Sequence, residues 1–422
     1  MDWYIYVAWA AIISQLIFLW QTHSNCRYAL KKYKKKRSWY RPRTVLIVPC
    51  KGLDSSFREN ITSFFNLDYE NYLLWFVVAD ESDPAYKELC DLKDKLKAGS
   101  KAQDVQVFVA GYGQSCSQKI HNLLYCYERI GDDVEVLAFA DSDICIRANW
   151  LSHIVYPLRK SKNGVASGYR WYIPKRNNLA SLALSAMNAK IAQLLGNTPF
   201  NQVWGGSMAI RVDVFRKLGI DKIWPKVLSD DLSLNCAVKK AGLRVFFVPA
   251  CLVASYERAT WRSLFEFSRR QFLITRVSAP RIWWLGLFSG FYSVLGTWGG
   301  AGLAIYAAKI HHRDLPLFIA VPVVFFVSQL IRVVLRQRMA RTLLTRSRPE
   351  GFPAEHRAMN AAYAADILAF WLWSFLLLCL ILASAFGRTI CWRGIRYRLQ
   401  GPMETIVEGS VPERNNHPTN RS

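Results

Sequence analysis

The feature that most restricts how this chain can fold is a set of four long apolar runs. They cover residues 3–20, about 282–309, 315–335 and 363–386, and the first contains no charged residue. A helix needs ~20 mostly apolar residues to cross the hydrocarbon layer of a bilayer. Each run meets or nearly meets that length, so a wholly soluble protein is excluded.

The charge balance points to an anionic partner. The chain holds 55 Lys and Arg against 31 Asp and Glu, a net charge of +24, which favours either nucleic acid or an anionic membrane face. Nine of the basic residues stand in 27–43, directly behind the first apolar run and with no acid among them. Positive flanks stay in the cytoplasm and attract anionic headgroups, and no nucleic-acid-binding motif accompanies the charge. We therefore expect an N-terminal transmembrane anchor (1–22), a basic juxtamembrane linker (23–43) on anionic headgroups, and no nucleic-acid partner.

The later apolar runs do not give a consistent count of membrane crossings. If the segment after residue 43 is cytosolic, three crossings within 285–390 put the basic stretch 391–400 outside, while the Arg-rich loop 336–357 stays inside. Both stretches have the charge of a cytosolic flank. We expect one run to be re-entrant or surface-bound, with 282–309 the first suspect because of its Gly299-Gly300 pair, and three to five crossings in total. The tail 391–422 is expected to be basic and then, after about residue 400, disordered.

Residues 44–258 have the pattern of a water-soluble α/β domain. Short apolar runs rich in β-forming residues alternate with segments of helical character; the expected strands are 44–50, 73–80, 105–111 and 134–141, and the expected helices are 57–67, 84–99 and 118–131. Strands buried on both faces and separated by helices predict a mostly parallel sheet. Ligands bind such sheets beyond the carboxyl ends of the strands, and two of these runs end in an aspartate, Asp80 and Asp141.

The segment that follows the domain differs from a spanning helix. Residues 259–284 mix Arg with Trp, Phe and Leu at helical spacing and lack a continuous apolar core. Such a helix can lie in the plane of the membrane interface, although a surface helix of the domain is the alternative. We expect an interfacial amphipathic helix over 259–284 and a transmembrane helical region over 285–390.

Two acidic motifs carry the expected chemistry. Asp141 and Asp143 stand one residue apart just past a strand, and such a pair can share one hard divalent cation whose other ligands are phosphate oxygens and water. An Asx-turn that ends the strand is the alternative. Asp230 and Asp231 precede a helical segment, where a helix N-cap is the structural alternative. Two adjacent acids exceed what a cap requires, and one carboxylate is suited to act as a general base on an acceptor hydroxyl.

Glycines and isolated basic residues add further candidates. Gly205-Gly206 either lets the backbone approach a ligand closely or forms a plain turn. Lys51, Lys119 and Arg170 are candidates to face the phosphates of a bound donor, although each alone carries little weight.

Taken in order, the motifs resemble a known family. VLIVPCKG, FVVADESDPAY, SQKIHNLL, FADSDI, SGYRWYIP, NQVWGGSMAIR, LSDDLSL and FVPACLVAS follow one another as in membrane-bound family-2 glycosyltransferases, in particular the ceramide-glucosyltransferase-like branch and related bacterial lipid glycosyltransferases. The resemblance runs from about residue 44 to 284, and weakly to WRGIRYRL near the end. It implies an inverting nucleotide-diphospho-sugar transferase of GT-A type, flanked by N-terminal and C-terminal transmembrane helices.

The resemblance also implies roles for single residues. Asp80 matches the aspartate that contacts the uracil of the donor. Asp143 matches the direct ligand of Mg²⁺ or Mn²⁺, with Asp141 beside it at the metal and near the ribose or diphosphate. Asp231 matches the general base that deprotonates the acceptor, with Asp230 as its supporting acid.

One family motif is incomplete in this chain. The motif consists of Gln or Arg, two variable residues and Arg-Trp on the interfacial helix. The stretch SRRQFLITR (268–276) keeps Gln271, but Leu273 and Ile274 are taken to replace Arg and Trp. Arg276, or else Arg269 and Arg270, is expected to supply a cation to the diphosphate instead.

The function expected from the resemblance is transfer of a hexose, in first place glucose from UDP-glucose, onto a lipid hydroxyl. The catalytic domain would face the cytosol from a bacterial inner membrane. A processive polysaccharide synthase and a non-catalytic membrane scaffold derived from this fold are the alternatives. The sequence leaves open the sugar, the lipid acceptor, the choice between Mg²⁺ and Mn²⁺, and the oligomeric state.

Overall fold

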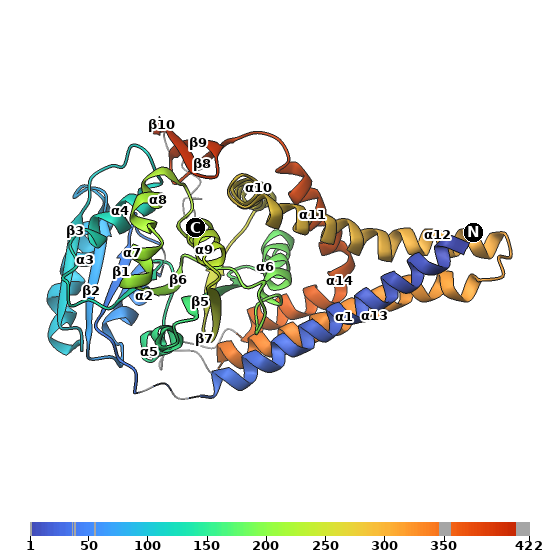
Figure 1. The fold of residues 1–422 in the computed structure, drawn as a ribbon, viewed down its shortest axis with the longest axis horizontal. Coiled ribbons are helices and arrows are strands. Elements are labelled where there is room, and N and C mark those ends of the chain that lie inside the picture. The colour runs from blue at the N-terminus through green and yellow to red at the C-terminus, as the bar shows by residue number, and fades with distance from the viewer. Residues whose placement is uncertain (1, 36, 38, 55, 346–355, 411–422) are drawn as a thin grey trace, which may run out of the picture.

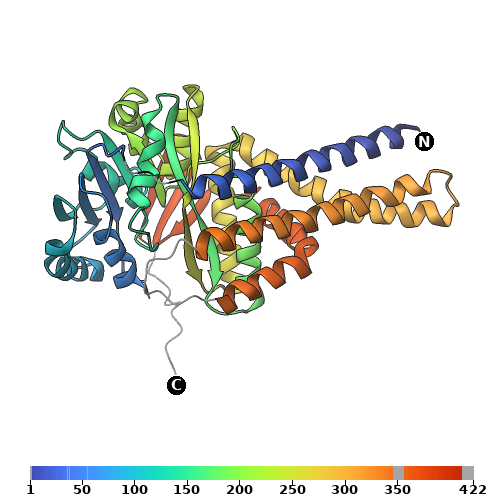
Figure 2. The ribbon, with the colours of Figure 1, turned by 90° about the horizontal axis from the view of Figure 1, so that it is seen from below.

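The protein consists of an α/β domain from which a long helical arm extends (Figure 1). The computed structural model describes residues 2–35, 37, 39–54, 56–345 and 356–410. The N-terminus lies at the far tip of the arm, and a second view of the same arm shows that it is narrow in both directions (Figure 2).

A seven-stranded sheet forms the centre of the domain, in the order β3-β2-β1-β4-β6-β5-β7. The pairs β1–β2, β2–β3, β1–β4 and β5–β7 are parallel, and β6 is antiparallel to both β4 and β5. The strands are β1 (Thr44–Pro49), β2 (Tyr72–Val78), β3 (Asp104–Val109), β4 (Val136–Ala140), β5 (Asn163–Pro174), β6 (Ser207–Arg211) and β7 (Arg244–Glu257). The four expected strands and the mostly parallel sheet are thus confirmed.

Helices cover both faces of this sheet, which explains why its strands are almost continuously apolar. Along β1, Leu46 and Val48 belong to the core on one face, whereas Val45 and Ile47 belong to the core on the other. The helices and short turns of the domain are α2 (Phe57–Phe65), α3 (Pro84–Leu96), η1 (Lys97–Gly99), α4 (Gln118–Tyr127), α5 (Trp150–Val155), η2 (Tyr156–Arg159), α6 (Leu179–Ala192), α7 (Val212–Lys217), α8 (Ile220–Ile223), η3 (Trp224–Lys226) and α9 (Asp230–Lys240). The three expected helices correspond to α2, α3 and α4.

The N-terminal helix is longer than the expected anchor. Helix α1 (Asp2–Tyr33) continues through residues that we expected in a linker. Its end is buried against the domain, where Cys26 and Ala29 pack with Phe247 of β7, and the Tyr28 hydroxyl donates to the Phe247 carbonyl oxygen at 3.2 Å. The basic segment is therefore partly helical and attached to the sheet.

Within the described residues, three helices are long and apolar enough to cross a membrane, namely Trp3–Tyr33, Leu315–Thr345 and Arg357–Ala383. The run that we suspected of being re-entrant is also helical throughout, as α11 (Pro280–Val294), the π-turn η4 (Leu295–Gly299) and α12 (Gly300–Lys309). It forms a hairpin with α13 (Leu315–Thr345) whose turn lies at the tip of the arm (Figure 1).

Gly296 in η4 and Gly300 at the start of α12 serve helix packing rather than a reversal of the chain. The Phe325 ring of α13 lies against Gly296, and Pro322 lies against Gly300. Small residues allow such close approach of helices in membranes. The Gly299-Gly300 pair therefore does not reverse the chain, and a crossing by 282–309 becomes the prediction.

The last apolar run, in contrast, changes direction midway. Helix α14 (His356–Ala383) has non-helical dihedral angles at Ala369. Its first half follows α13 outward, since Arg341 donates to Asn360 and Arg336 pairs with Asp366. Its second half returns along α11, as further contacts show: Trp371 with Trp298, Leu378 with Gly290, and Ser384 with Trp283. Both ends of α14 consequently lie at the domain end of the arm.

The interfacial helix is shorter than expected. Helix α10 (Trp261–Ser278) begins with a capping box between Thr260 and Ser263 and ends at Ala279, whose φ of −144° breaks the helix. Residues 280–284 belong to α11. Trp261 and Phe265 of α10 are exposed, as an interfacial helix requires.

The expected disorder after about residue 400 is wrong for residues up to Ser410. Strands β8 (Thr389–Trp392), β9 (Ile395–Gly401) and β10 (Glu404–Ser410) form an antiparallel sheet in the order β10-β9-β8. Burial alternates along β9, where Tyr397 and Leu399 are buried and Arg396 and Arg398 are exposed. The sheet packs on α10 through a cluster that includes Leu273, Ile274 and Tyr397. Residues 411–422 lie outside the described part.

The shape of α14 predicts the membrane topology. With α1, α11–α12 and α13 as the crossings, the C-terminal sheet lies on the same side of the membrane as the α/β domain, which agrees with the basic charge of residues 391–400 if that side is the cytosol. A protease added to sealed vesicles should therefore cut a C-terminal tag and a tag inserted at Lys95 in α3 from the same side. An N-terminal tag should be cut only from the other side. A C-terminal tag accessible from the side opposite to Lys95 would mean that α14 crosses the membrane.

Candidate active site

Most of the acidic candidates meet at the carboxyl edge of the sheet, where the strand order reverses between β1 and β4. Open α/β sheets bind ligands at such a switch point. Asp141 and Asp143 directly follow β4, and Lys51 follows β1. The amino end of α4, which carries Lys119, and that of α9, which carries Asp230 and Asp231, meet these residues, as the ion pairs below show. We call this cluster of charged side chains the acidic crevice.

Arg170 joins the two aspartates behind β4. Its Nη2 lies 3.0 Å from Asp141 Oδ2 and 3.5 Å from Asp143 Oδ1. The guanidinium also lies 4.7 Å from the centre of the Trp204 ring, which fixes it from one side. One positive group thus already bridges the carboxylates of the D-x-D pair.

Lys119 links this pair to the second acidic motif. Its Nζ lies 2.8 Å from Asp141 Oδ1 and 3.1 Å from Asp230 Oδ2. The contact with Asp230 is an ion pair without the alignment of a hydrogen bond, so Asp230 Oδ2 is buried without a hydrogen-bond partner. A buried acceptor of this kind is available to a ligand that donates a hydrogen bond.

The general-base candidate is oriented by three donors. Asp231 Oδ1 accepts from Ser229 Oγ at 2.5 Å and from Leu232 N at 2.7 Å, and Asp231 Oδ2 accepts from Gly205 N at 3.2 Å. Ser229 is the N-cap of α9, because its hydroxyl also accepts from Leu232 N. Ser229 therefore caps the helix, and neither Asp230 nor Asp231 is needed as the N-cap residue.

Gly205 and Gly206 allow the two acidic motifs to approach each other. A Cβ on Gly205 would lie 2.4 Å from Asp230 Oδ2, and one on Gly206 would lie 2.4 Å from Asp141 Oδ2. Distances under 3.0 Å are not tolerated by real Cβ atoms. The pair is thus more than a plain turn, because it makes room for carboxylates from β4 and α9.

The charges of the crevice shift one another's titration. Burial acts to raise the pKa of Asp141, but Lys119 and Arg170 bring it below its ordinary value. Burial raises the pKa of Asp143 against the opposing charge of Arg170. Burial would lower the pKa of Lys119 and of Arg170, yet the neighbouring carboxylates raise both. Both basic groups are therefore cations at every physiological pH.

Asp80 lies at the same edge but outside this cluster. It follows β2, which is separated from β4 by β1 alone, so the two strand ends are about 10 Å apart across the sheet. Its carboxylate accepts a hydrogen bond from Ser82 N at 2.8 Å, and the side chain of Ser82, followed by this backbone contact, lowers the pKa of Asp80. A ligand that contacts both Asp80 and Asp143 would therefore have to extend along the edge of the sheet, across the end of β1.

The candidates on α10 do not reach the acidic cluster. The Arg276 guanidinium donates to the carbonyl oxygens of Ala385 and Gly387, so it holds the segment after α14 rather than a diphosphate. Gln271 is exposed on α10. Counted from Gln271, the missing Arg-Trp pair falls at Ile274 and Thr275 rather than at Leu273 and Ile274. Ile274 is buried against the C-terminal sheet, and Thr275 Oγ1 donates to the Gln271 carbonyl oxygen.

A cation that the sequence did not single out comes from the C-terminal sheet. Arg393 and Gly394 form the two-residue turn between β8 and β9, with φ of 50° and 76°. Positive φ at both positions favours Asn-Gly, so an arginine there adopts an unfavourable backbone conformation. The Arg393 carbonyl oxygen accepts from Lys51 Nζ at 2.5 Å, and Arg393 Nη1 donates to the Lys51 carbonyl oxygen at 3.3 Å. The charge of Arg393 also acts to lower the pKa of Asp141 and Asp143, behind the effects of burial and Arg170.

The carboxylates fit a divalent cation that is shared with a substrate. No group of three or more His, Cys, Asp or Glu that could hold a metal alone occurs among the described residues. Asp141 and Asp143 provide two hard oxygen donors, which is the protein share that Mg²⁺ commonly takes when phosphates supply the rest. The pair already shares one positive group, the Arg170 guanidinium.

Comparison with known proteins identifies the family. The family model described as Glycosyl transferase family 21 matches residues 4–403. The chain belongs to glycosyltransferase family 21. This confirms the expected ceramide-glucosyltransferase-like branch, and it makes the chain a glycosyltransferase with the expected α/β fold of GT-A type.

Two solved structures are similar to this family 21 glycosyltransferase. One is the mannosyltransferase PcManGT from Pyrobaculum calidifontis in complex with GDP-Man and Mn²⁺, at 15% identity over 90% of this chain and 96% of that one, with a TM-score of 0.45. The other is GalNAc-T7 with UDP, GalNAc and Mn²⁺, at 14% identity over 56% of this chain and 51% of that one, with a TM-score of 0.39.

Asp230 gives the site a testable pH dependence of stability. Burial raises its pKa from 3.8 to about 6 against the opposing charge of Lys119, and Asp231 and Asp141 add to the rise. The folded protein thus keeps a proton that the unfolded chain has lost, and stability falls as the pH rises from about 4 to about 6. Asp230→Asn keeps the shape of the protonated side chain and avoids this loss. With a chelator present, the free energy of unfolding of the variant should equal that of the wild type near pH 4. At pH 7 it should exceed the wild-type value by an amount on the order of 2 kcal/mol.

The measurement is the thermal unfolding midpoint of the full chain in detergent at both pH values. Asp94→Asn, at an exposed position on α3, is the matched control and should show no pH-dependent difference from the wild type. If the difference in unfolding midpoint between Asp230→Asn and wild type were the same at pH 4 and pH 7, the pKa of Asp230 would not be raised in the folded protein.

Proposed function

We propose that this glycosyltransferase moves glucose from UDP-glucose onto the hydroxyl of a membrane lipid, with inversion at the anomeric carbon. The observation that carries the proposal is the acidic crevice, in which Lys119 and Arg170 draw Asp141, Asp143 and Asp230 together. Its position beside the helical arm suits an acceptor that stays in the bilayer. We further propose that the domain faces the cytosol from a bacterial inner membrane.

The donor would lie along the carboxyl edge of the sheet. Asp80 would accept from the uracil, and the nucleotide would run past β1 toward β4. Lys119, Arg170 and Arg393 would face the diphosphate, with Lys119 at the amino end of α4, where backbone N–H groups also favour anions. Gln271, exposed on the adjacent α10, is a further donor-side candidate.

Asp143 and Asp141 would hold the Mg²⁺ or Mn²⁺ that this donor set fits. When bound, the cation supplies compensation for the charge that develops on the departing diphosphate. Arg170 bridges the same two carboxylates in the structure, so donor binding would move its guanidinium toward the phosphates. The partly buried Trp204 ring would keep that guanidinium in the crevice.

Asp231 would act as the general base. Its carboxylate would take the proton of the acceptor hydroxyl while that oxygen bonds to the anomeric carbon, and the bond from this carbon to the diphosphate oxygen would break on the opposite side. The hydrogen bonds from Ser229, Leu232 and Gly205 would hold the carboxylate in line. Asp230, with its buried oxygen free to accept, would orient a sugar or acceptor hydroxyl beside it.

The incomplete Arg-Trp motif bears on the processive alternative. A chain-extending synthase is expected to have an aromatic ring beneath the acceptor sugar, whereas Ile274 is buried against the C-terminal sheet and Thr275 bonds back to its own helix. This packing favours a single transfer to a lipid over polymer synthesis.

Transfer to lipid is tested with membranes that contain the full chain, labelled UDP-glucose and Mg²⁺ or Mn²⁺. We expect label in the organic phase, and Asp231→Asn should lower its formation by ~10²–10⁴-fold while UDP binding persists. Asp94→Asn is the control of equal charge change. Label in a large aqueous polymer would indicate the processive synthase instead, and full turnover by Asp231→Asn would move the base elsewhere.

The position of Arg393 predicts that this residue contributes to binding of the diphosphate but not of the nucleoside. Because Arg393 is held against Lys51 at the end of β1, Arg393→Gln should weaken UDP binding by about tenfold, the loss of one charge-assisted contact. Uridine, which lacks the phosphates, should bind both proteins equally. Isothermal titration with the two ligands measures this, and Arg396→Gln on the exposed side of β9 is the control. Equal UDP affinity in wild type and Arg393→Gln would remove Arg393 from the donor site.

A further inference from the structure

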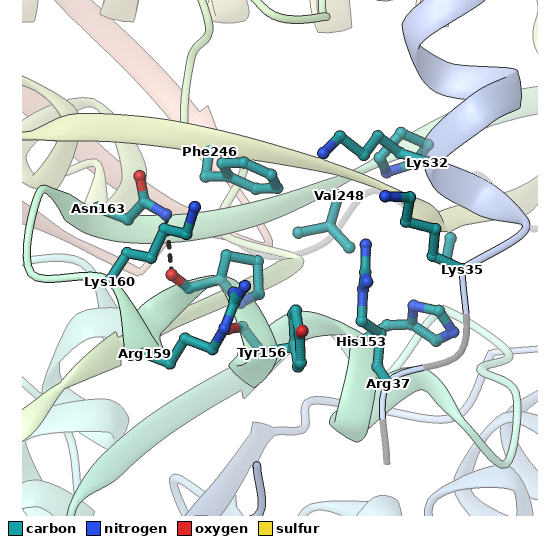
Figure 3. Close-up of a pocket in the computed structure, with 13 residues that line it drawn as sticks. Lys32, Lys35, Arg37, His153, Tyr156, Arg159, Lys160, Asn163, Phe246 and Val248 are labelled. Carbon is teal, nitrogen blue, oxygen red and sulfur yellow. Dashed lines mark hydrogen bonds between the residues drawn. The ribbon is translucent and has the colours of Figure 1, made fainter. Parts of the chain in front are cut away.

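A strongly basic cavity lies far from the acidic crevice. It has a volume of about 270 Å³ and is lined by the end of α1, by η2 and by the first residues of β5 and β7 (Figure 3). Asn163, the first residue of β5, lines it, whereas Arg170 of the crevice stands seven residues further along the same strand. At ~3.3 Å per residue, the two sites are about 20 Å apart, at opposite edges of the sheet.

Five cations line this cavity without a carboxylate among its lining residues. Lys32, Lys35 and Arg37 approach from the α1 side, and Arg159 and Lys160 approach from η2 (Figure 3). None of the five forms an ion pair with an acid in the part of the chain that the structure describes. Like charges held so close repel one another, and an anion bound between them would relieve that repulsion.

Aromatic side chains hold two of these cations in place. The guanidinium carbons of Arg37 and Arg159 lie 4.4 and 3.9 Å from the centre of the Tyr156 ring. Trp39 Nε1 donates to the Tyr156 hydroxyl at 3.2 Å and so fixes the ring. Guanidinium groups oriented in this way present planar pairs of donors, which suit a phosphate.

A buried histidine, His153, contributes an uncharged polar side chain to the lining of the cavity. Burial, with help from Arg37 and Arg147, lowers the pKa of His153 to about 4. Its ring is therefore uncharged near neutral pH and can hydrogen-bond without adding to the repulsion. The cavity thus combines fixed cations with a neutral polar group, as a specific anion site requires.

We propose that this cavity binds a phosphate-bearing anion. Both a soluble phosphate compound and a lipid headgroup have that chemistry, but position favours the soluble source. Counted from Trp3, a span of ~20 residues ends near Thr22, and Lys32 lies ten residues, or about 15 Å, beyond it. The headgroup layer is only about 5–8 Å thick on each side.

The experiment uses the full chain in detergent and three probes: pyrophosphate, phosphatidylglycerol and the neutral lipid phosphatidylcholine. Native mass spectrometry measures binding of each probe to wild type, to Lys35→Gln/Lys160→Gln and to the control Lys87→Gln/Lys95→Gln. Both pairs are exposed and remove two charges, the first at the cavity and the second on α3. Because pyrophosphate can also enter the acidic crevice, the difference between the two variants, rather than total binding, reports on the cavity.

We expect pyrophosphate affinity to fall at least tenfold, on the order of one charge-assisted contact or more, in the cavity variant alone. A loss of phosphatidylglycerol but not phosphatidylcholine in that variant would instead identify the headgroup as the source, and it would still support the site. Equal binding by both variants, for pyrophosphate and for phosphatidylglycerol, would overturn the proposal, since the effect would then be one of net charge.

Discussion

Two mostly buried cations, Lys119 and Arg170, determine the arrangement of the candidate active site. Each contacts two aspartates, and together they connect the end of β4 to the first turn of α9. Carboxylates buried without such partners would repel one another and lose their hydration, at a cost of several kcal/mol each. Lys51 and Arg393 add further positive charge at the end of β1, so the site combines carboxylate oxygens for a metal ion with cations for a diphosphate.

The fold was predictable from sequence where burial on both faces leaves an unambiguous pattern. Strands β1 to β4 are continuous apolar runs bounded by helices, so both their limits and the parallel sheet could be inferred. The two acidic motifs could be proposed because each follows or begins a regular element. In contrast, the bridging role of Arg170 depends on the pairing of β5 with β6, a contact that no local pattern contains.

Other features were missed because hydropathy does not record the direction in which a helix runs. The apolar run that forms α14 has the composition of a spanning helix, and nothing in it reveals the break at Ala369. The C-terminal sheet did leave a signal, since basic and apolar residues alternate along β9 with a period of two. We interpreted its basic residues as a cytosolic flank of a membrane helix and did not use the alternation, which is typical of a half-buried strand. Arg393 was missed for the same reason.

The place of the β8–β9 turn in the chain has a consequence for biosynthesis. Lys51 near the beginning of the domain bonds to Arg393 near the end of the protein, and Gln118 N donates to the Tyr397 hydroxyl of the same sheet. A ribosome makes this sheet only after the helical arm. The candidate site therefore gains its contacts with β8 and β9 only once the arm has been translated, and a nascent chain lacks them while its helices enter the bilayer.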